Sequence, residues 1–246
     1  MLVFNGKRFK QMKLLLLSNS TNAGEDYLAY TLPYIAEFIQ SKPLNALFIP
    51  YAGVSISWDE YFEMVSAKLE SIGIRLTSIH HEEHAQQAIE KAELIIVGGG
   101  NTFNLLKTLQ EKDLIPHIQK AVYTGTPYIG WSAGSNMGCP TIRTTNDMPV
   151  VEPESFNALG FIPFQINPHF TDAKMEGHAG ETREMRIAEF LIANPGMYCA
   201  GLREGTLFLV ENDSIELLGK KPCRIFKHGQ EAYELNPGDD FSFLMQ

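Results

Sequence analysis

The chain has 246 residues, a formal net charge of −9 at pH 7 and a hydrophobic content of 44%. This length fits one large domain better than two small ones, and either can bury a substantial core. The sequence pI near 5.3 and the lack of any lysine and arginine cluster argue against nucleic acid as a partner, because nucleic acid requires a basic surface.

Membrane and secreted classes are also disfavoured. The sequence has no run of about 18 apolar residues that could span a bilayer, and its first residues lack the apolar core and cleavage site of a signal peptide. Cys139, Cys199 and Cys223 are odd in number and widely spaced, which argues against a disulfide framework or a structural zinc site. We therefore expect a cytoplasmic protein whose cysteines are free thiols.

Apolar runs typical of buried strands alternate with amphipathic segments in the first half of the chain. Strands are predicted at residues 13–17, 45–50, 74–79, 94–97 and 127–129. Helices are predicted at 27–39, 58–69, 84–91 and 102–120. This alternation predicts an α/β fold with a mostly parallel central sheet and helices on both faces.

The pattern changes beyond Arg143. A stretch rich in proline and asparagine covers residues 146–168, and a helix is predicted at 181–192. Short strands are predicted at 197–201, 206–210, 214–218 and 223–226. We interpret the last three strands as a C-terminal antiparallel extension of the same domain.

A serine stands at a predicted strand-to-helix turn, in Gly130-Trp131-Ser132-Ala133-Gly134. Glycines two positions before and after the serine allow a sharp turn that exposes its hydroxyl, with the next backbone N–H facing the same space. Small residues produce this pentapeptide by chance, but its place directly after a buried strand favours a nucleophile elbow at Ser132.

Sites in open α/β sheets gather beyond the carboxyl ends of the strands. Two further predicted strands end in Ser18-Asn19-Ser20-Thr21 and Gly98-Gly99-Gly100-Asn101-Thr102. The triple glycine does not match the G-x-G-x-x-G pattern of dinucleotide sites. We interpret it as the source of an oxyanion-hole N–H at Gly100, alongside that of Ala133; the alternative is a tight turn.

A serine nucleophile needs a general base, and the chain has seven histidines. His169 follows the apolar run 161–166 and a proline that restrains its backbone, which suits a base held at the sheet edge. Other histidines are expected in a mobile glycine-flanked loop or at the surface: His178, His117 and His228.

The segment His80-His81-Glu82-Glu83-His84 matches the H-x-x-E-H zinc pattern. It covers the end of a predicted strand and the start of a predicted helix. His80 and His84 therefore do not share a helical face, and we expect no metal there.

Seven blocks in chain order resemble peptidase E, a family of bacterial α-aspartyl dipeptidases: LLLLSNST, FIPYAG, IIVGGGNTF, YIGWSAGSN, PTIRTTNDMP, QINPHF and GETREMRI. The resemblance covers nearly the whole chain from Met12. It implies a fold like that of class I glutamine amidotransferases, with serine in place of their cysteine, and cofactor-free hydrolysis of dipeptides with an amino-terminal aspartate. Residues 12–246 would form one domain, with 1–11 as a flexible extension.

The resemblance implies Ser132 as nucleophile and His169 as general base, and it supports either Asp147 or Glu204 as the acid. We favour Glu204, because it follows the predicted strand 197–201 and has a glycine neighbour that frees its loop. Asp147 is then expected to act on loop structure or on the amino end of the substrate.

An acidic protein that binds an acidic dipeptide must supply local positive charge, because diffuse charge is screened over about 8 Å. Arg183, at the start of a predicted helix, is the expected ligand for the substrate carboxylate. Asn101 is also expected to bind substrate. Arg143 is the next candidate for the residue that binds the substrate carboxylate.

Two alternatives remain at this point. An α/β-hydrolase esterase shares the elbow, but its acid belongs to a much later strand, whereas Asp147 lies only 15 positions after Ser132 (147 − 132). The second alternative is a non-catalytic protein with an amidotransferase-like fold that acts in binding or in a stress response. A fluorophosphonate probe separates them, because a binding protein should not be labelled at Ser132.

Overall fold

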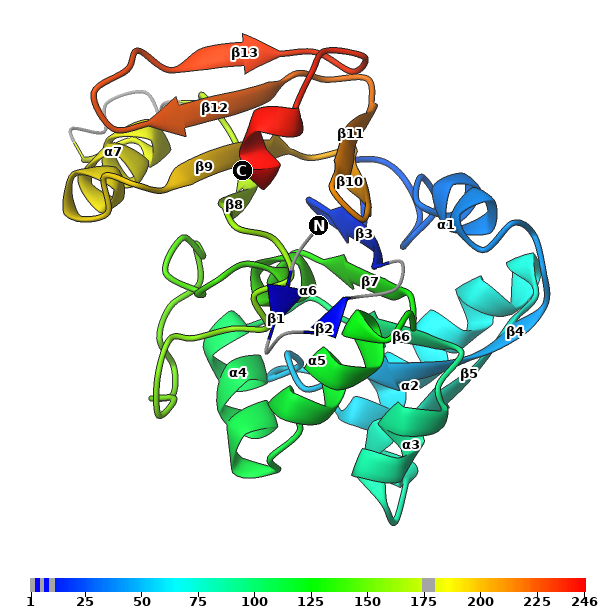
Figure 1. Cartoon of the computed structure of the whole chain (residues 1–246). Helices are drawn as coiled ribbons and strands as arrows, with labels where there is room; N and C mark the ends of the chain where they lie inside the picture. The colour runs from blue at the N-terminus through cyan, green and yellow to red at the C-terminus, as the bar shows by residue number, and fades with distance from the viewer. Residues whose placement is uncertain (1–2, 5–6, 9–11, 174–179) are drawn as a thin grey trace.

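The computed structural model describes residues 3–4, 7–8, 12–173 and 180–246 (Figure 1). His178 and the loop around it lie outside the described residues. Within the amino-terminal extension, β1 (Val3–Phe4) pairs antiparallel with β2 (Lys7–Arg8).

A seven-stranded sheet with the order β11-β10-β3-β7-β6-β4-β5 forms the centre of the molecule. Its parallel strands are β3 (Lys13–Leu17), β7 (Tyr128–Trp131), β6 (Leu94–Val97), β4 (Leu44–Ile49) and β5 (Ile74–Ser78). The parallel strands in the middle of the sheet are almost wholly buried, as their unbroken apolar sequences predict.

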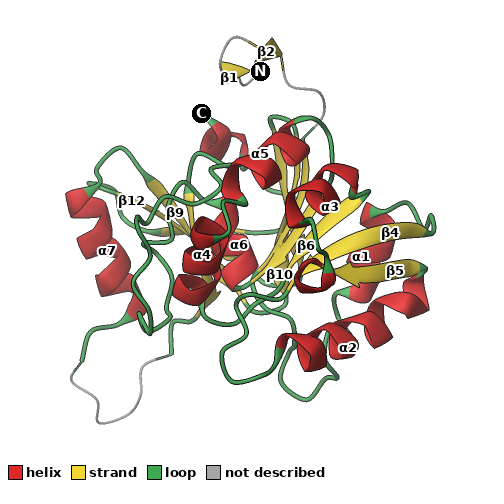
Figure 2. Ribbon diagram, turned by 90° about the horizontal axis from the view of Figure 1, so that it is seen from below, coloured by secondary structure: helices red, strands yellow, loops and turns green. Residues whose placement is uncertain are grey.

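Helices cover both faces of this sheet. One face carries α1 (Leu32–Phe38) and α2 (Trp58–Leu69), the latter followed by the short η1 (Glu70–Ile72). The other carries α3 (Ala85–Lys91), α4 (Thr102–Glu111), α5 (Ile115–Tyr123) and α6 (Ala133–Gly138). Alternate residues of β3 point to opposite faces. Leu15 and Leu17 pack into the core under α1 and α2, and Leu14 and Leu16 pack into the core under α3 to α6. Figure 2 shows α2 on one side of the sheet and α3 and α5 on the other. The predicted fold class is confirmed.

Two predicted helices have different boundaries in the structure. The helix expected from residue 27 begins only at Leu32, because Leu28 has a positive φ of 59° and Pro33 occupies the first turn. The helix predicted over 102–120 is two helices, since Asp113 at φ 51° ends one and Pro116 opens the next.

The C-terminal strands pair antiparallel, as predicted, but they are divided between two sheets. The hairpin of β10 (Thr206–Glu211) and β11 (Ser214–Gly219) joins the central sheet antiparallel to β3. A second sheet, β13-β12-β9-β8, contains β8 (Gln165–Phe170), β9 (Tyr198–Arg203), β12 (Cys223–Lys227) and β13 (Tyr233–Leu235). Here β8 and β9 run parallel. The chain thus crosses between the two sheets in the two residues that separate β9 from β10.

The second sheet has its own small core. Helix α7 (Arg183–Ala193) packs on it through Ile187 and Leu191, which meet Phe170 and Phe226. The chain ends in η3 (Ser242–Met245). The three cysteines are buried free thiols, as predicted, and burial raises the pKa of Cys139 to about 12. In the described part of the chain, no helix has the length and apolar character needed to cross a membrane.

Candidate active site

Ser132 stands at the sharp turn between β7 and α6. Its backbone has φ 52° and ψ −110°, a conformation that non-glycine residues rarely adopt. Gly130 and Gly134 must be glycines, because a side chain at either position would collide with the backbone. A Cβ on Gly130 would lie 2.4 Å from the carbonyl oxygen of Gly134, and one on Gly134 would lie 2.3 Å from that of Val97. The strand and the helix can therefore pack closely enough to hold the serine at the turn.

His169 approaches Ser132 from the second sheet. Its Nε2 lies 2.9 Å from Ser132 Oγ. His169 lies inside β8 rather than in a loop after a strand, at an irregularity in register between Asn167 and Phe170. Its φ of 53° is a local distortion of the strand, and its backbone N–H donates to Ser18 Oγ at 2.9 Å. Such bulges re-aim side chains, and this one turns the ring toward the elbow.

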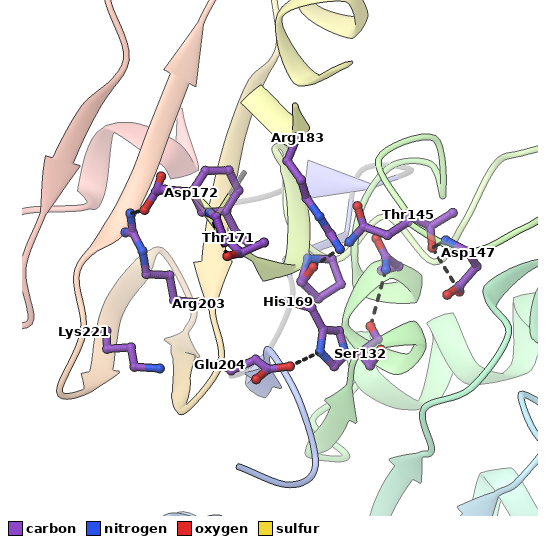
Figure 3. A pocket seen from close by; sticks show the side chains of 15 residues that line it. Ser132, Thr145, Asp147, His169, Thr171, Asp172, Arg183, Arg203, Glu204 and Lys221 are labelled. Atoms are coloured by element: carbon purple, nitrogen blue, oxygen red, sulfur yellow. Dashed lines mark hydrogen bonds and ion pairs between the residues drawn. The ribbon is translucent and has the colours of Figure 1, made fainter. Parts of the chain in front are cut away.

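Glu204 lies at the crossing from β9 to β10 and meets the other nitrogen of the ring. Its Oε1 is 2.7 Å from His169 Nδ1 (Figure 3). Gly205, at φ 83°, makes the turn that follows. Ser132, His169 and Glu204 thus form a continuous hydrogen-bonded series, with the imidazole and carboxylate side chains 38% and 45% exposed.

Strand-end residues of β3 support this series, although the sequence did not assign them this role. Ser18 Oγ donates to the Leu202 carbonyl at 2.7 Å while it accepts from the His169 backbone N–H. Asn19 Oδ1 accepts from the Gly205 N–H at 2.9 Å and from the Tyr30 hydroxyl at 2.7 Å. The signal in the sequence is their position directly after a buried strand.

Asp147 has a different set of partners. Its Oδ2 accepts hydrogen bonds from the Thr102 N–H at 2.7 Å, the Thr102 hydroxyl at 2.5 Å and the Thr145 hydroxyl at 3.0 Å. The carboxylate is thus placed at the amino end of α4, where a negative charge is favourable. Asn101 caps the same helix, with Oδ1 accepting from the Asn104 N–H at 3.0 Å and Nδ2 donating to the Met148 carbonyl at 2.8 Å.

The triple glycine lies against the elbow. Gly100 has φ 133°, and a Cβ there would lie 2.3 Å from the Ala52 carbonyl oxygen. The Asn101 N–H donates to that same oxygen at 2.8 Å. A Cβ on Gly99 would lie 3.1 Å from Ser132 Cβ. The loop backbone and the amino end of α6, at Ala133, therefore both adjoin the serine.

A cavity of about 840 Å³ opens beside the series and is lined by residues from both sheets. Its ionisable lining residues are Asp147, His169, Asp172, Arg183, Arg203, Glu204 and Lys221. A second cavity of about 530 Å³, on the side of the triple glycine, shares Ser132, Asp147 and His169 with it. Ser132 therefore faces a site with two compartments.

Arg183 is the first residue of α7 and points into the larger cavity (Figure 3). Its Nη1 is buried, and no residue in the described ranges accepts a hydrogen bond from it. Burial lowers the pKa of Arg183, and Arg186 adds to this, while Glu204 and Asp147 act in the opposite direction. Arg203 differs, since it pairs with Asp172 and with Glu234 at 2.7 Å.

Arg143, the second candidate for the substrate carboxylate, has its guanidinium 5.9 Å from the centre of the Phe156 ring. It lines a neighbouring cavity to which Arg183 also contributes. Sequence reasoning did not single out Arg203 or Lys221, which come to the main cavity from β9 and from the turn before β12.

Comparisons with known proteins agree with the geometry. Residues 14–218 match the model of peptidase family S51. Peptidase E of Nostoc sp. strain PCC 7120 is 48% identical over 234 residues, covering 95% of this chain and 97% of that protein. Peptidase E of Shigella flexneri is 50% identical over 230 residues, covering 94% and 100%.

Two solved structures share the fold. A putative peptidase E protein from Listeria monocytogenes EGD-e superposes with a TM-score of 0.65 at 22% identity, covering 86% of this chain and 100% of that one. A peptidase from an acI-B1 actinobacterium gives 0.69 at 19%, covering 92% and 95%. The family match confirms the resemblance and favours a peptidase over the esterase and the binding protein. The chain therefore belongs to peptidase family S51 and is a serine peptidase.

Proposed function

We propose that this serine peptidase hydrolyses dipeptides with an amino-terminal aspartate through a triad of Ser132, His169 and Glu204. The observation that carries the proposal is the buried guanidinium nitrogen of Arg183, without a protein partner in the described chain, in the same cavity as the serine and the histidine. A buried donor of this kind is costly unless a ligand satisfies it, and a carboxylate matches a guanidinium in charge and shape.

The triad distances support an acyl-enzyme mechanism. His169 Nε2 accepts the proton of Ser132 Oγ as the oxygen attacks the peptide carbonyl, and Glu204 stabilises the imidazolium through Nδ1. The N–H groups of Gly100 and Ala133 bind the oxyanion. The imidazolium then protonates the leaving amine, and a water activated by the same imidazole releases the acyl group. None of these steps uses a cofactor.

The charges in the cavity suggest how an Asp-Xaa dipeptide is held. The side-chain carboxylate of the substrate pairs with Arg183, and its α-ammonium lies toward the acidic side formed by Asp147 and Glu204. Asn101 also lines the smaller cavity, but its side chain caps α4 and donates to the Met148 carbonyl, so its main role in this arrangement is to support the glycine loop.

Substrate preference tests the proposal directly. The purified protein should hydrolyse Asp-Leu with a much higher kcat/KM than Asn-Leu and Glu-Leu, and Asp-Leu-Leu should be a poorer substrate than Asp-Leu. Release of the free amino acids would be followed by chromatography. Equal hydrolysis of Asp-Leu and Asn-Leu would contradict the proposed recognition of a carboxylate.

Replacing Arg183 by methionine should reduce kcat/KM for Asp-Leu by about 10- to 100-fold, mainly through KM, because charge-assisted hydrogen bonds contribute about 1.5–3 kcal/mol. Activity on Asn-Leu should change little, so the preference for aspartate narrows. Arg186→Met is the matched control, because this arginine of the same helix is 72% exposed and pairs with Glu181. If the Asp/Asn ratio stays at its wild-type value in Arg183→Met, the carboxylate binds elsewhere.

Replacing Gly100 by alanine should lower kcat by about 100- to 1000-fold, the usual cost of losing one oxyanion donor. The new Cβ would collide with the Ala52 carbonyl, and φ 133° is strained for alanine, so the loop must move. Gly196→Ala is the control, because a Cβ there meets nothing within 4 Å. Wild-type kcat in a folded Gly100→Ala protein would remove this N–H from the mechanism.

A further inference from the structure

A group of side chains of the kinds that bind metal ions lies at the end of β5, outside the two cavities that contain Ser132. His80 and His81 belong to the short helix η2 (Ile79–His81), and Asp59 lies in the first turn of α2. The Nε2 atoms of His80 and His81 lie 3.0 and 2.5 Å from the same oxygen, Asp59 Oδ1. One ligand atom from each residue lies within 4.8 Å of the other two.

This group uses only part of the H-x-x-E-H segment. His84 is the residue before α3 and is not one of the three converging residues. The expectation of no metal considered His80 and His84 on a shared helical face. The tertiary structure instead supplies a carboxylate from 21 residues earlier in the chain, which that pattern does not contain.

The two rings are held in place by their surroundings. His80 Nδ1 lies 2.6 Å from the hydroxyl of the buried Ser78. Metal-binding histidines usually donate their second ring N–H in this way, which fixes the tautomer and aims the other nitrogen at the ion. The His80 ring lies 5.7 Å from that of Trp58, and the His81 ring 5.4 Å from that of Phe62.

We propose that Asp59, His80 and His81 bind a divalent transition-metal ion, with Zn²⁺ as the best match. Zinc sites use imidazole and carboxylate ligands about 2.0–2.2 Å from the ion, which places neighbouring ligand atoms about 3.3 Å apart in a tetrahedron. Small side-chain rotations would bring the three ligand atoms to this separation. The Asp59 side chain is 71% exposed and has room to rotate, whereas the His80 side chain is only 11% exposed and stays in place.

The environment favours one ion class over others. Two imidazoles and one carboxylate suit zinc, whereas magnesium and calcium prefer all-oxygen sites. Three protein ligands leave a fourth position open to water. The bound ion would fasten the first turn of α2 to the segment after β5. The site takes no part in the hydrolytic steps described above.

Zinc binding to the full-length protein, with any affinity tag removed and after chelator treatment, tests the proposal by calorimetry. One Zn²⁺ per chain should bind at this site, and Mg²⁺ should not. At a hundredfold excess of Zn²⁺ over Kd, Tm should rise by about 5–10 °C, because a ligand that binds only the folded state stabilises it. Addition of chelator should reverse the rise.

Variants assign the ion to these residues. Asp59→Asn and His81→Ala should each weaken zinc binding by at least about tenfold, and Ser78→Ala by about 10- to 100-fold. His84→Ala is the matched control and should bind zinc like the wild type. Circular dichroism checks that each variant is folded. The proposal is overturned if zinc does not bind, or if Asp59→Asn and His81→Ala bind it as the wild type does, which would place the ion elsewhere, for example on His169.

Discussion

Replacing Ser132 by alanine should lower kcat for Asp-Leu by about four to six orders of magnitude, because removal of a triad nucleophile leaves only the contribution of binding and of the oxyanion hole. The fold should be retained. The Ser132 hydroxyl lies within hydrogen-bond distance of His169 at a partly exposed position, and the backbone N–H that donates to the Leu17 carbonyl is unchanged by the substitution. The measurements are steady-state kinetics, labelling by a fluorophosphonate probe and a thermal melt.

Ser135 provides the matched control, three residues further on in the same elbow. Its buried hydroxyl donates to the Leu17 and Gly130 carbonyls at 2.7 and 2.8 Å. Ser135→Ala should therefore cost about 1–2 kcal/mol of stability and keep most of the activity. A folded Ser132→Ala protein that kept even a tenth of wild-type activity, or that still reacted with the probe at one site, would show that another residue is the nucleophile.

Replacing Glu204 by glutamine should lower kcat by about three to four orders of magnitude and leave KM for Asp-Leu nearly unchanged. A carboxylate both selects the ring tautomer that accepts the serine proton and stabilises the imidazolium, and a neutral amide does neither well. The 2.7 Å contact to His169 Nδ1 makes Glu204 the group in position for this role. Kinetics over a range of Asp-Leu concentrations separate the effects on kcat and KM.

Asp147→Asn is the comparison that decides between the two acids. The hydrogen bonds of Asp147 to Thr102 and Thr145 place it at the amino end of α4, and it lines both cavities beside Ser132, so its substitution should act chiefly through KM. A normal kcat in Glu204→Gln beside a collapsed kcat in Asp147→Asn would reverse the assignment of the acid. Thermal melts of both variants show whether loss of the helix-end contact also lowers stability.

Local sequence determined much of the architecture. The apolar runs of β3 and β6 are complete strands at the predicted bounds, because a strand buried on both faces must be apolar at nearly every position. The helix predicted at residues 58–69 is observed with the same ends, since Ser57 and Glu60 form a capping box and the buried face repeats with helical spacing. The elbow was predictable because its serine lies between two glycines directly after a buried strand. The steric demand on Gly130 is local, whereas that on Gly134 comes from Val97 of the neighbouring strand β6.

Tertiary structure decided how distant segments meet. The hairpin of β10 and β11 extends the central sheet, whereas β12 and β13 belong to the second sheet, because pairing depends on which strand edges are free. The bulge that turns His169 toward Ser132 depends on contacts with Ser18, 151 residues away.

The sequence by itself determined most strands of the central sheet, the elbow, the expected base and the family, because short-range periodicity and ordered motifs are properties of local sequence. Glu204 could be favoured over Asp147, but only the meeting of the two sheets brings its carboxylate to the ring. The sequence alone also did not reveal the group of Asp59, His80 and His81, because Asp59 lies on a helix and the two histidines follow a separate strand. Contacts between side chains of distant elements depend on how whole helices and strands pack together, which a local sequence pattern does not specify.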